Sequence, residues 1–335
     1  MVPVERVRQV SKKVLANAGV PEPHSELQVD LLLEAELRSR PSHGLLRLAR
    51  IVERIRNGVT DPRTTGKHNW QGTAFLEVDG QQGLGPVVAC AALDVICERA
   101  RTTGISIAAI ANNNHLGMMA WYAERIAARG MTIIALSTSE ALVHAWGGRR
   151  PVLGTNPIAI GVPGRPRPFV IDMATSLVSM GQIYDHALRN KPIPPHWAKD
   201  TEGNPTTDAV AARDGAIAPF GEAKGYALGL AFEVMVASLT ASALGRDVRG
   251  TLDSTQTCNK GDLFIVIDSA ASSTMADAVG SYLDTIRTDM PALGFDRVAI
   301  PGDRSLAIRQ KRMLDGISVA DDIWTNLLQL AGDKS

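Results

Sequence analysis

The chain changes its hydrophobic period twice along its length, and this feature most constrains what it can fold into. Apolar residues recur every three or four positions near the N-terminus, which predicts helices over residues 4–18, 26–37 and 45–56. Gly19 and Gly58 follow two of these segments, in positions where glycine commonly ends a helix. The stretch 305–331 returns to helical spacing with one break near Gly316. Both ends of the chain are therefore expected to be helical.

The middle of the chain alternates short β-rich runs with helical stretches. Strands are expected at residues 74–78, 105–110, 132–136, 157–162, 169–171 and 263–267, and helices at 87–100, 118–128, 180–188 and 226–244. Such alternation predicts an α/β fold, here with a mixed sheet. Two domains are expected: residues 1–68 with 300–335 form a helical domain from both termini, and residues 69–299 form the α/β domain. The polar passage 200–208 is expected to be a loop.

Composition excludes several classes of function. The 35 Lys and Arg residues balance the 35 Asp and Glu residues, so no net field attracts nucleic acid or an anionic membrane. The odd set Cys90, Cys97 and Cys258 forms no CxxC pair or metal-ligand cluster, which favours a reducing compartment. Residues 1–20 lack the continuous apolar stretch of a signal peptide or membrane span. We expect a cytoplasmic protein with no nucleic-acid partner, no membrane partner and no metal.

A conventional dinucleotide-binding fingerprint is missing from this sequence. A Rossmann enzyme shows GxGxxG between its first strand and helix, because glycines let the backbone approach the pyrophosphate. Gly83, Leu84 and Gly85 run instead into Pro86, Val87 and Val88, so the third glycine is lacking. We interpret this segment as a tight turn that starts a helix.

His43 and Arg47 form the first candidate site. They are four residues apart at the start of a predicted helix, which places an imidazole and a guanidinium on one face. The planar fork of arginine suits a carboxylate and stays charged at any working pH. The pair is therefore a candidate for holding an acidic substrate. The alternative is a solvated helix face with an N-terminal histidine.

His115 is the candidate general acid and base. It follows the apolar strand that ends near Ile110 and precedes a helix, at a strand end where α/β proteins place site residues. Histidine titrates nearest neutrality, so it can take a hydroxyl proton when hydride leaves and return it in the reverse direction. The alternative is a histidine that caps the following helix.

Three further segments combine glycine or small hydroxyl residues with turns. They are residues 147–157, 172–176 and 221–226. The last places Lys224 between glycines at a helix start, and a helix N-terminus with a nearby lysine suits a phosphate. Each segment is equally compatible with ordinary turn chemistry.

Taken in order, eight short motifs resemble those of the type-2 malate/L-lactate dehydrogenase family of non-Rossmann NAD(P) oxidoreductases, over nearly the whole chain. The motifs are Ser42-His43-Gly44 with Arg47, Asn114-His115-Leu116-Gly117, Gly154-Thr155-Asn156-Pro157, Asp172-Met173-Ala174-Thr175, Asn204-Pro205-Thr206-Thr207-Asp208, Lys224-Gly225-Tyr226, Lys260-Gly261-Asp262 and Pro301-Gly302. Each one alone is weak, and their common order carries the resemblance.

The resemblance implies a dehydrogenase that uses NAD or NADP to move hydride to or from C2 of a small 2-hydroxy or 2-oxo acid. The α/β domain would bind the cofactor and the substrate without a Rossmann fold. His115 matches the family's proton donor and acceptor, and His43 and Arg47 match its substrate-binding residues, with the arginine on the carboxylate. The implied cofactor-binding residues are Ser139, Asp172, Met173, Ala174, Thr175 and Lys224. The resemblance also implies a homodimer with the substrate site near the subunit contact.

The positions after Arg47 carry information about the substrate. Arg50 and Ile51 stand where the ureidoglycolate enzymes carry tyrosines, which disfavours ureidoglycolate. Arg50 as a second cation predicts a second anionic group, and residues 248–251 and 258–262 resemble the sulfolactate and malate branches. We expect a dianionic C3 or C4 hydroxy acid, with lactate within the same class. The alternative for Arg50 is a surface ion pair with Glu53 or Asp30.

Two functions of other kinds stay open. One is reduction of a cyclic imine, such as Δ1-piperideine-2-carboxylate or Δ1-pyrroline-2-carboxylate, for which the same hydride geometry serves. The other is a non-catalytic protein that binds a small acid or a nucleotide. The choice between NAD and NADP also stays open, because the acidic ribose-binding residue of a Rossmann motif has no counterpart in this sequence.

Overall fold

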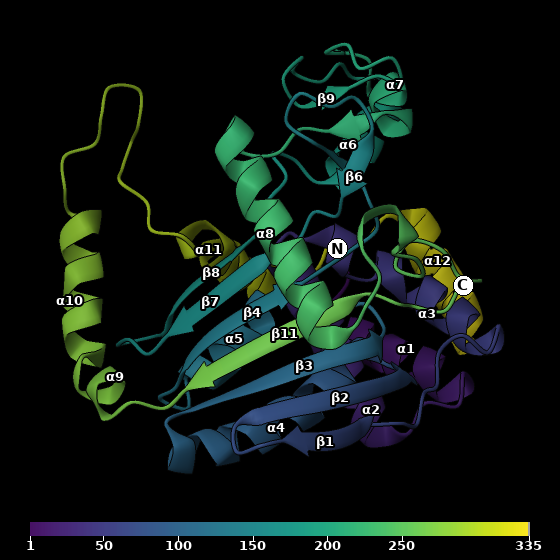
Figure 1. Ribbon diagram of the computed structural model, residues 1–335. Helices are drawn as coiled ribbons and strands as arrows, with labels where there is room; N and C mark the ends of the chain where they lie inside the picture. Colours follow the sequence, from purple (N-terminus) through teal and green to yellow (C-terminus); the bar gives the residue numbers. More distant parts are fainter. Residues whose placement is uncertain (334–335) are drawn as a thin grey trace.

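The computed structural model describes residues 1–333, apart from the side chain of Ser273, so the last two residues of the predicted helical domain lie outside the description. Its centre is a seven-stranded mixed sheet with the order β1-β2-β3-β11-β4-β7-β8 (Figure 1). The strands are β1 Lys67–Gln71, β2 Phe75–Gly83, β3 Ile105–Asn113, β11 Gly261–Ile267, β4 Thr132–Ser137, β7 Ile158–Val162 and β8 Phe169–Met173. Only β2 and β3 run parallel, and the other neighbouring pairs are antiparallel. The predicted α/β class and mixed sheet are confirmed.

Helices cover both faces of this sheet (Figure 1). On one face, α4 Gly85–Thr103 and α5 Ala120–Ala127 bury residues such as Ile96 and Tyr122 against the strands. On the other face, α8 Glu222–Thr240 packs Phe232 and Val236 against Leu263. Alternate residues of a strand point to opposite faces, which is why the central strands β4 and β11, covered on both faces, are almost entirely apolar rather than alternating.

Helices from both termini pack together at one side of the sheet. They are α1 Val4–Asn17, α2 Glu22–Leu37, α3 Leu46–Arg56, α11 Asp303–Asp315 and α12 Asp321–Ala331. Val2 pairs with Ile317 through two backbone hydrogen bonds of 2.8 Å, and apolar residues of α1, α2, α3 and α12 share one buried cluster. We propose that residues 1–68 and 300–335 form one domain on this basis, although Leu84 and Val87 of the α/β part join the same cluster.

A small lobe and a projecting arm were not foreseen from the sequence. The lobe contains a four-stranded sheet of β5 Val143–His144, β6 Pro151–Leu153, β9 Ala198–Lys199 and β10 Ala216–Ile217, with α6 Met180–Leu188 and α7 Ala209–Asp214. Strands of two or three residues carry no periodic signal. The arm contains α9 Ala270–Thr274 and α10 Ala276–Arg287 and stands away from the body (Figure 1). Ala276, Val279, Leu283 and Ile286 of α10 are at helical spacing, so this helix was missed although the sequence carries its pattern.

Some predicted boundaries were wrong. Helix α8 was expected at residues 226–244 but begins and ends four residues earlier. Gly221 at its N-cap and Ala241 at its C-cap adopt positive φ values of 56° and 50°, which interrupts the helical hydrogen bonding at both ends. By contrast, Gly19, Gly58 and Gly316 end their helices with φ values between 73° and 88°, as predicted.

One edge of the sheet collects the predicted site motifs. The chain leaves β2, β3, β4 and β8 at this edge and enters β7 and β11 there, because Gly83 pairs with Asn113, Ser137 with Asp262 and Ile158 with Met173. Segments around residues 83–85, 113–117, 137–139, 155–157, 173–175 and 260–262 are therefore neighbours in space. Segments far apart in the sequence can thus build one site.

Candidate active site

His43 and Arg47 do not share a helix, contrary to the prediction. His43 ends a 3-10 turn, η1 Pro41–His43, and Arg47 lies in the first turn of α3. Gly44 stands between the two elements in an extended conformation, and a Cβ there would lie 2.2 Å from the Glu36 carboxylate. Glu36 accepts a hydrogen bond of 2.8 Å from the Leu45 backbone N–H. This buried contact breaks the helix and still brings His43 and Arg47 to the same cavity.

Arg47 holds one end of the cavity. Its Nε donates a hydrogen bond of 2.7 Å to the Ser42 carbonyl, and its Nη1 lies 3.5 Å from the Thr251 carbonyl. The pKa of Arg47 is lowered to about 10, chiefly by desolvation and then by the positive charge of Arg50, and Glu140 opposes both effects. Nη2 has no hydrogen-bond partner among the described residues, so part of the fork is left for a ligand.

Arg50 lines the same cavity from the next turn of α3. Within residues 1–333 no carboxylate lies within 4 Å of it, and Asp30 instead pairs with Arg8 at 2.5 Å. The alternative of a surface ion pair with Glu53 or Asp30 is therefore not seen. Arg54, one turn further along, differs because it bonds to Asn114 and to the carbonyls of Asp253 and Gln256 at 2.8–3.1 Å.

His115 lies on the loop that follows β3, and contacts with the end of β2 and with Gly85 fix this loop. The Asn114 amide donates to the carbonyls of Gln82 and Gly83 at 2.7 and 2.8 Å, which ties the loop to the end of β2. Gly85 lies so close beneath that a Cβ would come within 2.1 Å of the His115 carbonyl oxygen. Glycine is therefore required at position 85 for this loop to pack where it does.

The tautomer of His115 is set by its own loop. The Gly117 backbone N–H donates a hydrogen bond of 3.1 Å to His115 Nδ1. Nδ1 is thus an acceptor, and in the neutral ring the proton lies on Nε2. The alternative role as a helix cap is not seen, because α5 begins at Ala120 and the Asp172 carboxylate accepts its first N–H at 2.8 Å.

The two imidazole rings stack with their centroids 5.5 Å apart. Desolvation lowers the pKa of both histidines, and Arg47 adds electrostatic repulsion of their charged forms. The pKa of His43 falls to about 4, and that of His115 falls well below its ordinary value. Both rings are therefore neutral at physiological pH, and the Ser42 hydroxyl lies 3.0 Å from His43 Nδ1.

Two cavities meet at these rings. The first cavity, of about 520 Å³, is lined by Arg50 and Arg54 and by apolar residues of α2 and α3. The second cavity, of about 790 Å³, extends past Ser139, Thr155 and Lys260. The lining residues that both cavities share are His43, Arg47, His115, Gly117 and Thr251. A ligand in one cavity and a ligand in the other would therefore come together at His115. Of the described residues, no group of His, Cys, Asp and Glu is placed to hold a metal ion.

Comparisons with known proteins agree with this geometry. Residues 2–328 match the model of the malate/L-lactate dehydrogenase family. The chain belongs to the malate/L-lactate dehydrogenase family. A malate/(S)-sulfolactate dehydrogenase of Methanothermus fervidus is 34% identical, with 98% of this chain and 96% of that protein covered. A dehydrogenase of Sinorhizobium meliloti with a solved structure is 49% identical, has a TM-score of 0.95, and is matched over 98% of this chain and 97% of that one.

A third relative has a different activity. A Δ1-pyrroline-2-carboxylate reductase of Pseudomonas fluorescens is 32% identical over 94% of each chain. The predicted family membership and the prediction of an NAD(P)-dependent dehydrogenase are confirmed. A non-catalytic binding protein, the other function left open by the sequence, is excluded by this membership. In the part of the chain that the structure covers, no helix is long and apolar enough to cross a membrane.

The residues that the resemblance assigned to the cofactor of this dehydrogenase fall into two groups. Ser139 lines the second cavity, and its hydroxyl accepts a hydrogen bond of 3.0 Å from the backbone N–H of Thr155. Thr175 is buried behind Thr155 and donates to its carbonyl at 3.0 Å. Met173 and Lys224 are exposed, and neither is among the residues that line the two cavities. Asp172 accepts a hydrogen bond from the first N–H of α5, which gives it a structural role. Ala174 lies between Met173 and Thr175 in the sequence.

Sequence reasoning missed several residues of the dehydrogenase's site. Thr251 and Lys260 line the cavity, and Glu140 accepts hydrogen bonds from the backbone of Thr251 and Leu252 at 2.7 and 2.9 Å. Residues 251–252 are thereby held against Arg47. Glu140 follows Ser139 directly, and Lys260 lies in a motif that resembled the family, but neither position has a local pattern that separates a site residue from a turn.

Proposed function

We propose that this enzyme transfers hydride to and from C2 of a small 2-hydroxy acid that carries a second anionic group, of the malate or sulfolactate type. The observation that supports this is the pair Arg47 and Arg50, which face one cavity beside His115. Two cations that face one cavity without a carboxylate are costly unless a ligand supplies the negative charge. A dianionic acid supplies one charge to each guanidinium.

The protein's own residues hold the acid and exchange its proton. The planar fork of Arg47 binds the C1 carboxylate, and Arg50 binds the second anion deeper in the first cavity. His115 lies where both cavities meet, so it faces the C2 oxygen of an acid clamped in this way. Positioning can contribute roughly 7–11 kcal/mol to the rate, and an acid/base group typically contributes about 10²- to 10⁴-fold.

The hydrogen bond from Gly117 constrains the role of His115. With Nδ1 as an acceptor, the neutral ring presents Nε2–H, which suits a hydrogen bond to the oxygen of a 2-oxo acid. In the oxidation direction a ring nitrogen must accept the hydroxyl proton. The Gly117 contact must then open so that the proton can move to Nδ1.

The second cavity has the lining expected for a nicotinamide nucleotide. Its wall combines hydroxyl groups of Ser139 and Thr155 with apolar side chains, as small-molecule sites commonly do. When bound, the nicotinamide ring would take the hydride from C2 in oxidation and return it in reduction. The nicotinamide end of the cofactor would be held by Ser139, Thr155 and Thr175. Its outer end would be held by Asp172 to Ala174 with Lys224.

A spectrophotometric screen at 340 nm tests this function. NAD and NADP are each offered with malate, lactate, 3-sulfolactate and ureidoglycolate. Turnover is expected to be fastest with a dianionic acid, and a preference for lactate or ureidoglycolate would contradict the assignment of Arg50. His115→Ala is expected to lower turnover about 10²- to 10⁴-fold while NADH binding, followed by fluorescence, is retained.

A cyclic imine reductase is the second candidate function. The observation that favours it is the reductase relative, together with the Ser42–His43 pair that faces the same centre. Reduction of Δ1-piperideine-2-carboxylate or Δ1-pyrroline-2-carboxylate by NADPH, without oxidation of any hydroxy acid, would replace the first proposal. A cyclic imino acid has one carboxylate, so Arg50→Met would then leave its reduction unchanged.

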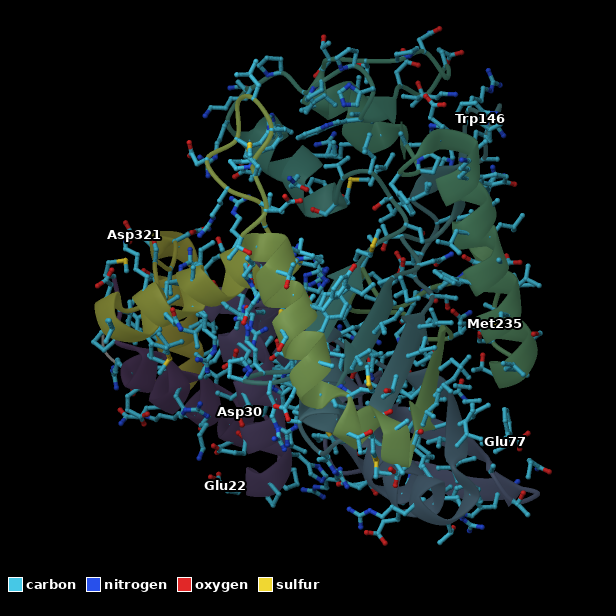
Figure 2. The ribbon with its side chains drawn as sticks, turned by 90° about the vertical axis from the view of Figure 1, so that its left-hand side faces the viewer. Glu22, Asp30, Glu77, Trp146, Met235 and Asp321 are labelled. Atoms are coloured by element: carbon cyan, nitrogen blue, oxygen red, sulfur yellow. The ribbon has the colours of Figure 1, made fainter. Side chains whose placement is uncertain are left out.

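We further propose a homodimer formed through the outer face of α8. Its exposed apolar residues are Leu228, Leu230, Val234, Met235 and Leu239, and Figure 2 shows Met235 at the outer edge of the molecule. A continuous apolar stretch of this kind is unusual on a monomer. Met173 and Lys224 are exposed beside this face, so a second copy would also complete the outer wall of the cofactor site.

Sedimentation at micromolar concentration tests the dimer. The native chain is expected to sediment as a dimer and Val234→Asp as a monomer. Leu314→Asp, on the exposed face of α11, is the matched control and is expected to stay dimeric. A monomeric native chain would overturn this proposal without affecting the proposed reaction.

We also propose a reducing, cytoplasmic location. Cys90, Cys97 and Cys258 are all free thiols, Cys97 and Cys258 are buried, and Cys97 lies in an apolar cluster. Detection of the native enzyme in an oxidising compartment by cell fractionation would contradict it.

A further inference from the structure

A buried ion pair lies beside the reacting centre, and the proposed roles of Arg47, Arg50 and His115 do not involve it. Lys260 precedes β11 and is 2% exposed, and Asp262 lies two residues further on and is 0% exposed. Their side chains form an ion pair, and Asp262 also accepts hydrogen bonds of 2.6 Å from the Ser137 hydroxyl and 3.1 Å from the Asn113 amide. Three strands, β3, β4 and β11, thus hold one carboxylate.

The distribution of hydrogen bonds is unequal between the two partners. Asp262 has three partners in the described chain, whereas Lys260 has only Asp262. An ammonium group carries three N–H donors, so two of them are left. Lys260 is also a lining residue of the second cavity, together with His115. A buried cation with spare donors next to a cavity is better explained by a ligand than by packing.

Stability alone does not account for this pair. Removing two charges from water is costly, and apolar residues of similar size usually stabilise a core equally well or better. The pair lies at the sheet edge where the segments of the site converge, and the backbone of Gly261 is already fixed by hydrogen bonds with Thr138 of 3.0 and 3.1 Å. Lys260 is therefore not needed to hold the end of β11.

We propose that Lys260 is a catalytic residue whose ammonium donates a hydrogen bond to the C2 oxygen of the bound acid, and that Asp262 positions it. This inference rests on the proposed function. In oxidation the proton of the C2 hydroxyl passes to His115, the hydride leaves C2, and Lys260 keeps all its protons. In reduction the same proton returns from His115 to the C2 oxygen.

The positive charge of Lys260 would make proton transfer from the C2 hydroxyl to His115 easier. An alcohol is a very weak acid, and His115 is surrounded by positive charges from Arg47 and Arg50 of α3, from the neighbouring His43 when that ring is protonated, and from Lys260. Such surroundings make His115 a weak base. A cation at the C2 oxygen compensates, because it stabilises the alkoxide that develops as the proton leaves.

The test uses a double variant that removes both charges at once. Lys260→Met alone would leave Asp262 buried without a partner, and loss of folding would then hide any catalytic effect. Lys260→Met with Asp262→Asn avoids that problem. Lys260→Arg keeps the charge, and Lys191→Met, at an exposed lysine, is the matched control. Thermal melting establishes that each variant is folded.

Three readouts are compared with the native enzyme. The double variant is expected to lose about 10²- to 10³-fold in kcat, with a smaller change in KM for the acid and unchanged NADH binding. Lys260→Arg is expected to recover at least a tenth of the native kcat.

The outcomes separate this inference from the proposed function. A native enzyme that oxidises a hydroxy acid, with a folded double variant that keeps more than a tenth of kcat, would overturn the role of Lys260 and leave the function standing. A Lys260→Arg variant as slow as the double variant, or a loss of NADH binding equal to the loss of kcat, would also overturn it, because the pair would then act only through structure. A native enzyme without hydroxy-acid turnover would overturn both.

Discussion

Arginines on two neighbouring helices, α2 and α3, have opposite surroundings. Arg38 at the end of α2 is 7% exposed and forms a two-pronged ion pair with Glu124 at 2.5 and 2.6 Å, with a third contact to Glu34 at 3.1 Å. Glu34 in turn binds Arg309 of α11 at 2.6 Å. Arg47 and Arg50 of α3 are partly buried, and their side chains face a cavity and form no ion pair with the described residues.

The difference teaches how to tell a structural arginine from a ligand-binding one. Arg38, a buried guanidinium matched by carboxylates, joins α2 to α5 and shares Glu34 with Arg309 of α11. A guanidinium that is desolvated and unmatched costs free energy in the free protein. That cost is tolerated where a ligand removes it on binding, so unmatched cations mark the site.

Arg47→Met is expected to give the largest effect in the comparison. Truncation of a buried, hydrogen-bonded charge contact costs about 2–5 kcal/mol, so kcat/KM for the acid should fall roughly 30- to 4,000-fold. The melting temperature should change little, because no protein carboxylate loses its partner. Steady-state kinetics and thermal melting measure the two quantities, and Arg47→Lys serves as the charge-retaining control. A large drop in stability with normal kcat/KM would mean that Arg47, like Arg38, has a structural role.

Arg38→Met is expected to lower the stability of the protein and to leave kcat/KM nearly unchanged. Breaking a buried ion pair leaves Glu124 and Glu34 without their partner, which costs about 3–5 kcal/mol of unfolding free energy. Urea unfolding measures this loss, and kcat/KM per folded enzyme should stay within about threefold of native. Arg165→Met, whose pair with Asp277 is largely exposed, is the control and should leave the urea midpoint nearly unchanged. Equal losses in both variants would remove the distinction between these pairs.

The sequence predicts the elements of this fold better than the arrangement of its site. Hydrophobic periodicity identified the strands of the central sheet other than β1, whose residues are polar and mostly exposed at the sheet edge. It also placed the terminal helices, of which α1, α3 and α12 each bury one apolar face. The two-residue strands of the small lobe carry no such pattern.

The partners in the site depend on contacts between distant segments. Arg38 and Glu34 are one helical turn apart and could be paired from the sequence. The contacts of Arg38 with Glu124 and of Glu140 with Thr251 span 86 and 111 residues, so no local spacing indicates them. For the same reason, Arg50 could not be distinguished from a surface residue until the cavity was seen.

Arg50→Met is expected to have a smaller and selective effect. Arg50 is partly exposed, so its contact with the second anion is worth roughly 1–3 kcal/mol, or about 10- to 100-fold in kcat/KM. The loss should affect malate or sulfolactate and leave a monoanionic acid such as lactate nearly unchanged. The ratio of kcat/KM values for the two kinds of acid measures it. Equal losses for both kinds would mean that Arg50 acts on the shared carboxylate or on the fold.

The smallest expected effect is on stability at mildly acidic pH. The pKa of His43 is about 4 in the folded protein, chiefly through desolvation and then through Arg47 and Arg40, against about 6.5 in an unfolded chain. Above pH 6.5 the ring is neutral in both states. As the pH falls from about 6.5 towards 4, the unfolded chain binds a proton that the folded site does not, so stability is lost over this window.

Melting temperatures at pH 7.5 and pH 5.0 test this effect. The drop between the two values should be smaller in His43→Asn than in the native enzyme, because the variant has one fewer histidine whose protonation opposes folding. His196→Asn, at an exposed position, is the control and should show the native drop. A bound dianionic acid should also reduce the native drop, since its charges offset those of Arg47 and Arg50 and allow His43 to be protonated in the folded state. Equal drops in the native enzyme and in His43→Asn would show that the cationic cavity does not control this histidine, and the contrast between matched and unmatched arginines would then lose its electrostatic basis.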